Sequence, residues 1–252
     1  MELYTTSPNI FSDHSIAEGP QYIEHLFELL VGGANRPLFD HISVLEKLSQ
    51  KVNAKKRILI LFYKGYYYQR TITTQGNDSE KADTNKKALA NYEAFLREKV
   101  GPPEIQYYAQ WQAGLLQESL HYPWRQVQYT LLKARPLDPL RAEAHTRLIR
   151  HYLKESNWPL SYLFNSFSKE HFYNNCPARK WGIDPSCYNW RILDKQWAIC
   201  AALGNKEEMG KIRDELALYF STHKNGLGAD EYNYISQKLN PWTTETGLQP
   251  IR

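Results

Sequence analysis

Short amphipathic segments, each ended by proline or glycine, follow one another from residue 88 to residue 223. Each segment is about 12–18 residues long, the length of an ordinary globular helix. The first has apolar side chains at helical spacing, namely Leu89, Tyr92, Phe95 and Leu96. Helices of this length joined by short turns are typical of an α-solenoid. The sequence therefore predicts an all-α fold of paired antiparallel helices.

The predicted helices cover residues 88–99, 104–120, 123–135, 140–156, 159–172, 186–203 and 206–223. Upstream, apolar spacing predicts one helix from Gln21 to the Gly32-Gly33 pair and a second from Pro37 to Lys51. We expect residues 21–239 to form a single helical domain. Residues 1–20 are expected to be a flexible segment and residues 240–252 an irregular tail.

Residues 57–74 are ambiguous by composition. Their β-branched and aromatic residues favour strands, and Lys64-Gly65 could turn a hairpin. A helix would place Ile58, Phe62 and Gly65 on one stripe. We predict a helix because helices are expected on both sides. Residues 76–87 are charged and fit either a loop or the entry to a helix.

A repeat period supports the solenoid. Gly65 and Gly114 each fall in the first helix of a predicted pair, where a small residue allows two helices to approach closely. If the charged stretch at 76–87 is treated as an insertion, the pairs recur at about 35 residues, close to the tetratricopeptide period. We therefore expect a tetratricopeptide-like, right-handed superhelix.

Composition limits the partners and the chemistry. Lys and Arg number 31 against 27 Asp and Glu, and this net charge of +4 is too small to indicate nucleic acid. No apolar run is long enough for a membrane span, and residues 1–15 lack the pattern of a secretory signal, so we expect a cytoplasmic protein. Cys176, Cys187 and Cys200 form no close metal-ligand pair, so we expect reduced thiols, no metal and no cofactor.

Residues 88–153 carry a more specific pattern. An aromatic and Ala/Gly-rich helix is followed by Pro123-Trp124, then by the turn Asp138-Pro139-Leu140-Arg141-Ala142-Glu143-Ala144. Trp181-Gly182-Ile183-Asp184 continues the pattern. This region resembles the tetratricopeptide-like helical part attached to certain bacterial and viral glycosyltransferases, and the resemblance covers roughly residues 57–220. It implies a setting in glycan assembly, with a glycosyltransferase as a possible partner.

The catalytic part of that family is not matched. It resembles an α/β nucleotide-binding fold in which an Asp-x-Asp pair holds a divalent metal against the sugar nucleotide. This sequence contains no Asp-x-Asp, and the roughly 55 residues before the repeats cannot hold such a fold. We therefore expect a binding or scaffold module for a protein or peptide, without catalysis of its own. The alternative is a divergent carbohydrate-active enzyme that uses Glu143 or Asp194 together with Arg141.

Candidate binding residues come from two places. Arg141, Glu143, His145 and Arg150 lie on one predicted helix and could line a groove, or could serve only as caps and bridges. Tyr66, Tyr67 and Tyr68 are adjacent and cannot all face one core, so Tyr67 is a candidate for partner contact, as is Tyr107. Six tryptophans are expected to pack between helices as core wedges, namely Trp111, Trp124, Trp158, Trp181, Trp190 and Trp197.

Overall fold

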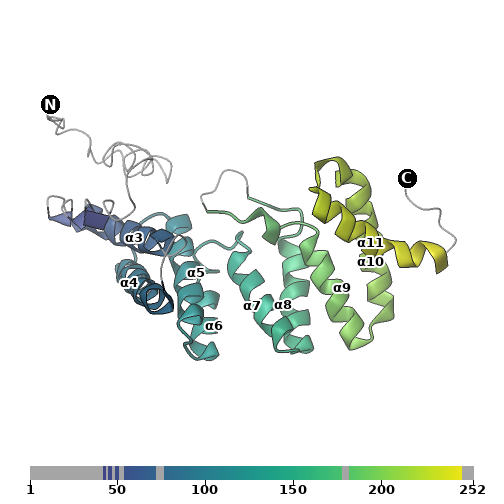
Figure 1. Cartoon of the computed structure of the whole chain (residues 1–252), viewed down its shortest axis with the longest axis horizontal. Helices are drawn as coiled ribbons and strands as arrows, with labels where there is room; N and C mark the ends of the chain where they lie inside the picture. The colour runs from purple at the N-terminus through teal and green to yellow at the C-terminus, as the bar shows by residue number, and fades with distance from the viewer. Residues whose placement is uncertain are drawn as a thin grey trace. The chain divides into compact units, whose positions relative to one another are not determined.

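The computed structural model describes residues 42–43, 45–46, 49–50, 54–71, 77–177 and 182–245, and every regular element in these ranges is helical (Figure 1). The elements are α3 (Ala54–Thr71), α4 (Asp78–Arg97), α5 (Pro103–Ser119), α6 (Trp124–Leu132), α7 (Glu143–Lys154), α8 (Trp158–His171), η3 (Pro185–Cys187), α9 (Arg191–Leu203), α10 (Lys206–His223), η4 (Lys224–Gly226) and α11 (Ala229–Glu245). The all-α prediction is confirmed for this part of the chain.

Two predictions near the ends of the chain have different outcomes. The helix expected from Gln21 lies outside the described residues, and that from Pro37 to Lys51 is described only in part, with Ile42 and Leu45 buried. The tail is not irregular throughout, because α11 continues to Glu245.

Contacts divide the chain into two compact units. Unit 1 comprises Met1–Pro139 with Arg179–Gly182, and unit 2 comprises Leu140–Ala178 with Ile183–Arg252. The single domain expected over residues 21–239 stays a prediction.

In unit 1, residues 57–71 belong to α3, so the helical prediction is confirmed and the hairpin alternative is wrong. The physical reason is the packing of α3 on α4. Phe62 is buried, and its ring centroid lies 5.9 Å from that of Tyr92 and 5.5 Å from that of Phe95. Burial of these aromatic side chains outweighs the local strand propensity of the segment.

The charged stretch at 76–87 is mostly helix. Asn77 caps α4 by accepting a hydrogen bond from the Glu80 N–H at 3.0 Å, and Glu80 accepts one in return from the Asn77 N–H at 3.3 Å. This reciprocal capping box satisfies amide groups that would otherwise lack partners at the helix start. The helix therefore begins at Asp78, ten residues before the first buried residue of its apolar face, Ala88.

Within unit 1, neighbouring helices are antiparallel and alternate helices are parallel. Along α3 and α5, Phe62 meets Tyr108 and Gln69 donates a hydrogen bond to Gln112, so the two helices run in the same direction. Gly65 and Gly114 stand where helices come closest: a Cβ atom on Gly114 would lie 2.5 Å from the Leu131 side chain of α6. Both glycines are therefore needed for close helix contact, as the sequence predicted.

Unit 2 repeats this arrangement with α7 to α11. Tyr162 and Lys169 of α8 bond Glu208 and Glu215 of α10 at 2.7 and 2.6 Å, in the same chain order. Along α9 and α11, Arg191 pairs with Glu231 at 2.7 Å and Asp194 pairs with Lys238, again in chain order. Gly204, at φ 71°, ends α9 in the left-handed conformation that favours glycine.

The start of α7 differs from the prediction. We expected this helix to begin at Leu140, directly after Asp138-Pro139, but it begins at Glu143 with Ala142 as its N-cap residue, and no side chain caps it. Arg141 therefore lies before the helix rather than on it.

We predict that Gly114→Ala destabilises the protein by about 1–3 kcal/mol, because the added methyl group overpacks the α5–α6 contact. The usual helical preference for Ala over Gly would by itself make the variant more stable than the wild type. Gly210, inside α10, is the matched control: no atom lies within 4 Å of a Cβ built there, so Gly210→Ala should stabilise the protein by about 0.5–1 kcal/mol. Urea unfolding measures the change in the free energy of unfolding of each variant. A change in the same direction for both variants would contradict the prediction.

Candidate functional site

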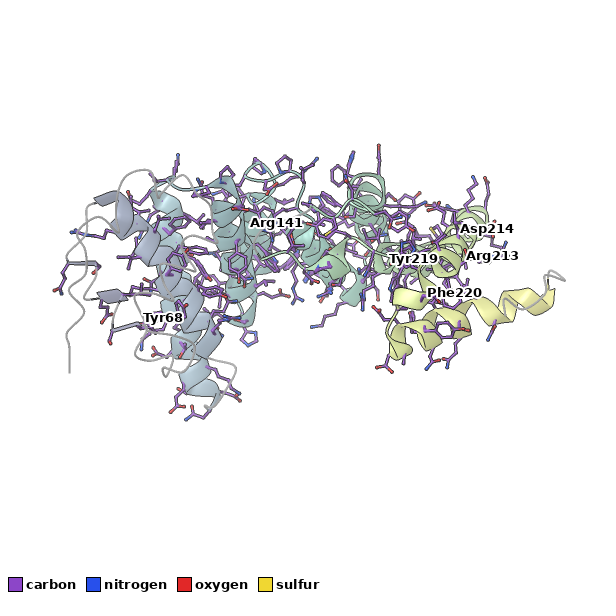
Figure 2. All side chains as sticks on the ribbon, turned by 90° about the horizontal axis from the view of Figure 1, so that it is seen from above. Tyr68, Arg141, Arg213, Asp214, Tyr219 and Phe220 are labelled. Carbon is purple, nitrogen blue, oxygen red and sulfur yellow. The ribbon has the colours of Figure 1, made fainter. Side chains whose placement is uncertain are left out.

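The predicted groove residues Arg141 and Glu143 form a buried ion pair in unit 2. The Arg141 Nε lies 3.1 Å from Glu143 Oε2, and Nη2 lies 3.0 Å from Oε1, so the contact is bidentate. Both side chains are 0% exposed. Figure 2 labels Arg141. A bidentate guanidinium–carboxylate pair is among the strongest polar contacts in proteins. Its burial excludes both residues from direct contact with a partner at the surface.

Glu143 accepts further hydrogen bonds from residues about forty positions along the chain. The Asp184 N–H donates to Oε1 at 3.1 Å, and the Tyr188 hydroxyl donates to Oε2 at 3.4 Å. The same hydroxyl accepts the Ala142 N–H at 2.9 Å. Burial, and then the nearby Glu143 charge, raise the pKa of Tyr188, so this hydroxyl keeps its proton. The cluster joins the start of α7 to the segment that carries η3.

His145 and Arg150 are placed differently from each other. His145 is buried, and its ring stacks on Phe167 with centroids 5.1 Å apart. Arg150 is exposed. The prediction that these residues line one groove with Arg141 and Glu143 is therefore wrong, because three of the four side chains are buried in the core of unit 2. The alternative of a structural role fits the contacts of Arg141, Glu143 and His145.

The tyrosine candidates lie in unit 1. Tyr107 is 0% exposed, so its prediction as a surface contact is wrong. Tyr66, Tyr67 and Tyr68 are all half-buried, and the Tyr66 and Tyr67 rings meet edge to face with centroids 5.4 Å apart. Tyr67 and Tyr68 pack against the core cluster of this unit, so the adjacent tyrosines are shared between core and surface.

The carboxylates of the enzyme alternative are both engaged. Glu143 is held in its ion pair. Asp194 accepts the Tyr234 hydroxyl at 3.1 Å on each oxygen and also pairs with the Lys238 ammonium. General acid–base chemistry needs carboxyl groups that reach a substrate. Both carboxylates are therefore held by neighbouring side chains of unit 2, Glu143 without exposure to solvent and Asp194 with partial exposure.

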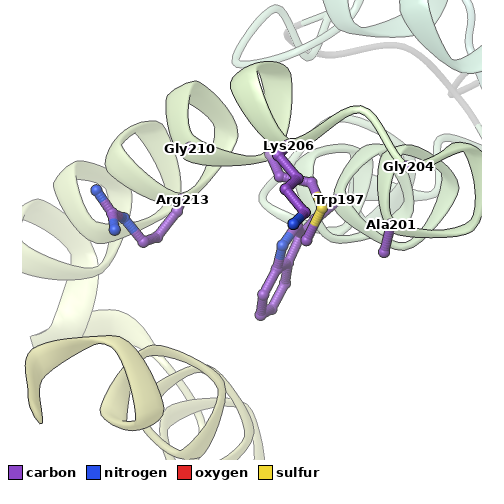
Figure 3. Close-up of a pocket in the computed structure, with 7 residues that line it drawn as sticks. Trp197, Ala201, Gly204, Lys206, Gly210 and Arg213 are labelled. Atoms are coloured by element: carbon purple, nitrogen blue, oxygen red, sulfur yellow. The ribbon is translucent and has the colours of Figure 1, made fainter. Parts of the chain in front are cut away.

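A pocket that sequence reasoning missed opens beside the α9–α10 hairpin (Figure 3). Its volume is about 520 Å³, within the range of ligand sites. The lining is mostly apolar, with two cations, and consists of Trp197, Ala201, Gly204, Lys206, Met209, Gly210 and Arg213. Trp197 was expected to be a core wedge, but it is only half-buried. The signal in the sequence was Gly210, a glycine inside a predicted helix.

The hairpin positions these residues through its turn. Gly204 ends α9, and Asn205 then caps α10 by accepting the Glu208 N–H at 3.2 Å. The Lys238 ammonium of α11 lies 4.5 Å from the centroid of the Trp197 ring, a cation–π contact that orients the indole. The pocket is therefore held by rigid helical elements and a short turn.

No protein-family model, curated protein sequence or solved structure matches this chain. Within the described ranges, His, Cys, Asp and Glu side chains form no group of three or more that could hold a metal ion. In those same ranges, no helix combines the length and the apolar character needed to cross a membrane.

Lys195 of α9 carries the most perturbed basic group described. Burial, and then the charge of Arg150, lower its pKa from the usual 10.5 to about 8. The ammonium donates to the Arg191 carbonyl at 3.3 Å. Burial of Lys195 therefore costs free energy whenever the side chain is charged.

We predict that removing one partner of the buried Arg141–Glu143 ion pair lowers the free energy of unfolding by more than removing one partner of a surface pair would. Arg141→Met leaves the Glu143 carboxylate buried without its cation and should lower the free energy of unfolding by about 3–5 kcal/mol. The double variant Arg141→Met/Glu143→Leu should lose less than the sum of the single changes, because it buries no charge. Chemical denaturation measures all three variants. A loss of about 1 kcal/mol for Arg141→Met, typical of a helix-end contact, would contradict burial.

We predict that Lys195→Met stabilises the protein by about 1–3 kcal/mol at pH 7. Below pH 8 Lys195 is charged in both the folded and the unfolded state, and burial of this charge destabilises only the folded state. Between pH 8 and 10.5, Lys195 keeps its proton in the unfolded chain but loses it in the folded protein. The free energy of unfolding of the wild type therefore rises with pH, and the difference in stability between Lys195→Met and the wild type becomes smaller. Thermal unfolding across this range measures the difference. The control Lys154→Met removes an exposed ammonium. If its stability relative to the wild type changed with pH as much as that of Lys195→Met, the prediction would be contradicted.

Proposed function

We propose that this chain is a helical-repeat module that binds a protein partner and has no catalysis of its own. The main support is the α9–α10 pocket, an open and mostly apolar space that the core packing does not fill. Pockets of this size with a few charged groups at the edge are typical of binding sites. The carboxylates that the enzyme alternative requires are engaged in other contacts.

The proposed architecture is a tetratricopeptide-like, right-handed solenoid. In support, helices come in antiparallel pairs within each unit, namely α3 with α4, α5 with α6, α7 with α8 and α9 with α10. The first two pairs each have a glycine of the first helix against a large side chain of the second, Tyr92 and Leu131. Stacked pairs of this kind offer extended surfaces for partner proteins.

A glycosyltransferase is the proposed partner, and glycan assembly in the cytoplasm is the proposed setting. Both rest on the resemblance of residues 57–220 to the helical region attached to such enzymes. A partner supplying the nucleotide-binding fold would complement this chain, which has no Asp-x-Asp pair.

The proposal is tested by affinity capture with the tagged full chain, followed by mass spectrometry. We expect a specific protein to co-purify in a fixed ratio, and a glycosyltransferase would support the proposed setting. Heat-denatured chain is the control for adhesion to exposed apolar surface. Equal recovery of the same proteins on native and denatured chain would contradict the binding function.

We further predict that the purified chain does not release nucleoside diphosphate from sugar nucleotides in the presence of Mg²⁺ or Mn²⁺. The reaction needs a metal held against the leaving phosphates, and the sequence lacks the carboxylate pair that does this in the resembling family. A coupled assay for the released diphosphate measures the outcome. Turnover that is lost on changing Glu143 or Asp194 to its amide would favour the enzyme alternative.

A further inference from the structure

We infer that the α9–α10 pocket takes a large apolar side chain from an acidic segment of the partner protein. The inference rests on the proposed binding function and names the chemistry of its occupant. Four features carry it: the apolar lining, the cations among the lining residues, the glycine in the second turn of α10, and the size of the space.

The apolar lining suits a large side chain. Trp197 provides a half-buried indole, whose ring Lys238 contacts, and Met209 provides a flexible thioether. Aromatic side chains gain from offset or edge contacts with an indole, and methionine adapts its shape to an incoming group. The volume of about 520 Å³ leaves room for one large side chain together with the backbone that carries it.

The charges at the pocket are positive. Lys206 and Arg213 line it, and no carboxylate is among the lining residues. The Lys206 ammonium has no hydrogen bond or ion pair with any residue that the structure describes. Arg213 is half-buried and pairs with the exposed Asp214, its neighbour on α10, with Nη2 2.6 Å from Oδ1. Figure 2 labels both residues. Pairs with an exposed partner contribute little, so a carboxylate of the partner protein can compete with Asp214 for the Arg213 guanidinium.

Gly210 has no explanation in the packing of the chain. It lies in the second turn of α10, where glycine is less favourable than alanine. Gly65 and Gly114 are also inside helices, but a Cβ atom at either would meet a neighbouring side chain within 3 Å. A Cβ atom at Gly210 would meet nothing within 4 Å and would extend from a residue that lines the pocket. Close approach of a ligand to the backbone accounts for glycine at this position.

These observations favour an acidic peptide segment over the other possible occupants. A second copy of this chain carries an overall net charge of +4, which does not favour its approach to the two lining cations. A purely apolar ligand would leave Lys206 without a counter-charge. A segment with carboxylates on either side of an aromatic or long aliphatic residue satisfies both the lining and the cations.

The test uses the full chain and fluorescein-labelled ten-residue peptides with a central Phe between Asp residues. Binding is followed by fluorescence anisotropy. Replacing the central Phe by Ala, or the flanking Asp by Lys, should weaken binding at least tenfold. Gly210→Leu should also weaken binding at least tenfold without lowering the melting temperature, because its side chain fills open space. Lys206→Gln should weaken binding severalfold, whereas its control Lys211→Gln, on the same helix but outside the lining, should not.

The outcomes separate this inference from the proposed function. Binding weaker than about 1 mM, or equal affinity for the Phe and Ala peptides, would overturn the inference. So would a wild-type dimer in sedimentation that Gly210→Leu converts to a monomer, which would assign the pocket to a second copy. If affinity capture of a partner persists unchanged with Gly210→Leu, the pocket inference fails while the binding function stands. If native chain captures nothing beyond the denatured control, the proposed function itself fails.

Discussion

The buried carboxylate of Glu143 is the constraint on which the packing of unit 2 depends. A charge taken out of water is tolerated only when its hydrogen-bonding capacity is satisfied, and here Arg141, the Asp184 amide and the Tyr188 hydroxyl together do this. The segment around η3 must therefore return to the start of α7. Tyr188 also accepts the Ala142 amide, which ties down a helix start that lacks a side-chain cap.

The glycines inside these helices differ in whether a neighbouring helix packs against them. At Gly65 and Gly114 the missing side chain allows neighbouring helices to pack closely, so the cost in helix propensity is offset by core contacts. At Gly210 no such contact exists, and the space above the backbone remains open. The same residue type therefore serves stability in unit 1 and lies beside open space in unit 2.

Much of the fold could be predicted because helix formation depends on local pattern. The proline and glycine breaks predicted the end of α4 and both ends of α5 to within two residues, whereas the apolar spacing of residues 88–99 missed the first ten residues of α4. Residues 57–71 were predicted only from their neighbours, since their own composition favours strands. The start of α7 was misplaced, because Asp138-Pro139 matches a common helix-start pattern while the observed start at Glu143 depends on contacts from residues 184 and 188.

By itself, the sequence determined the helical class, most helix limits and the glycines at close helix contacts, all of which follow from spacing along one chain segment. Tertiary structure decided the roles of the side chains. Arg141 and Glu143 could be read as groove residues because charged groups usually face water, yet partners more than forty residues away allow them to be buried. The pocket beside Trp197 likewise exists only where two helices meet, because its lining is brought together by the turn at Gly204 and Asn205.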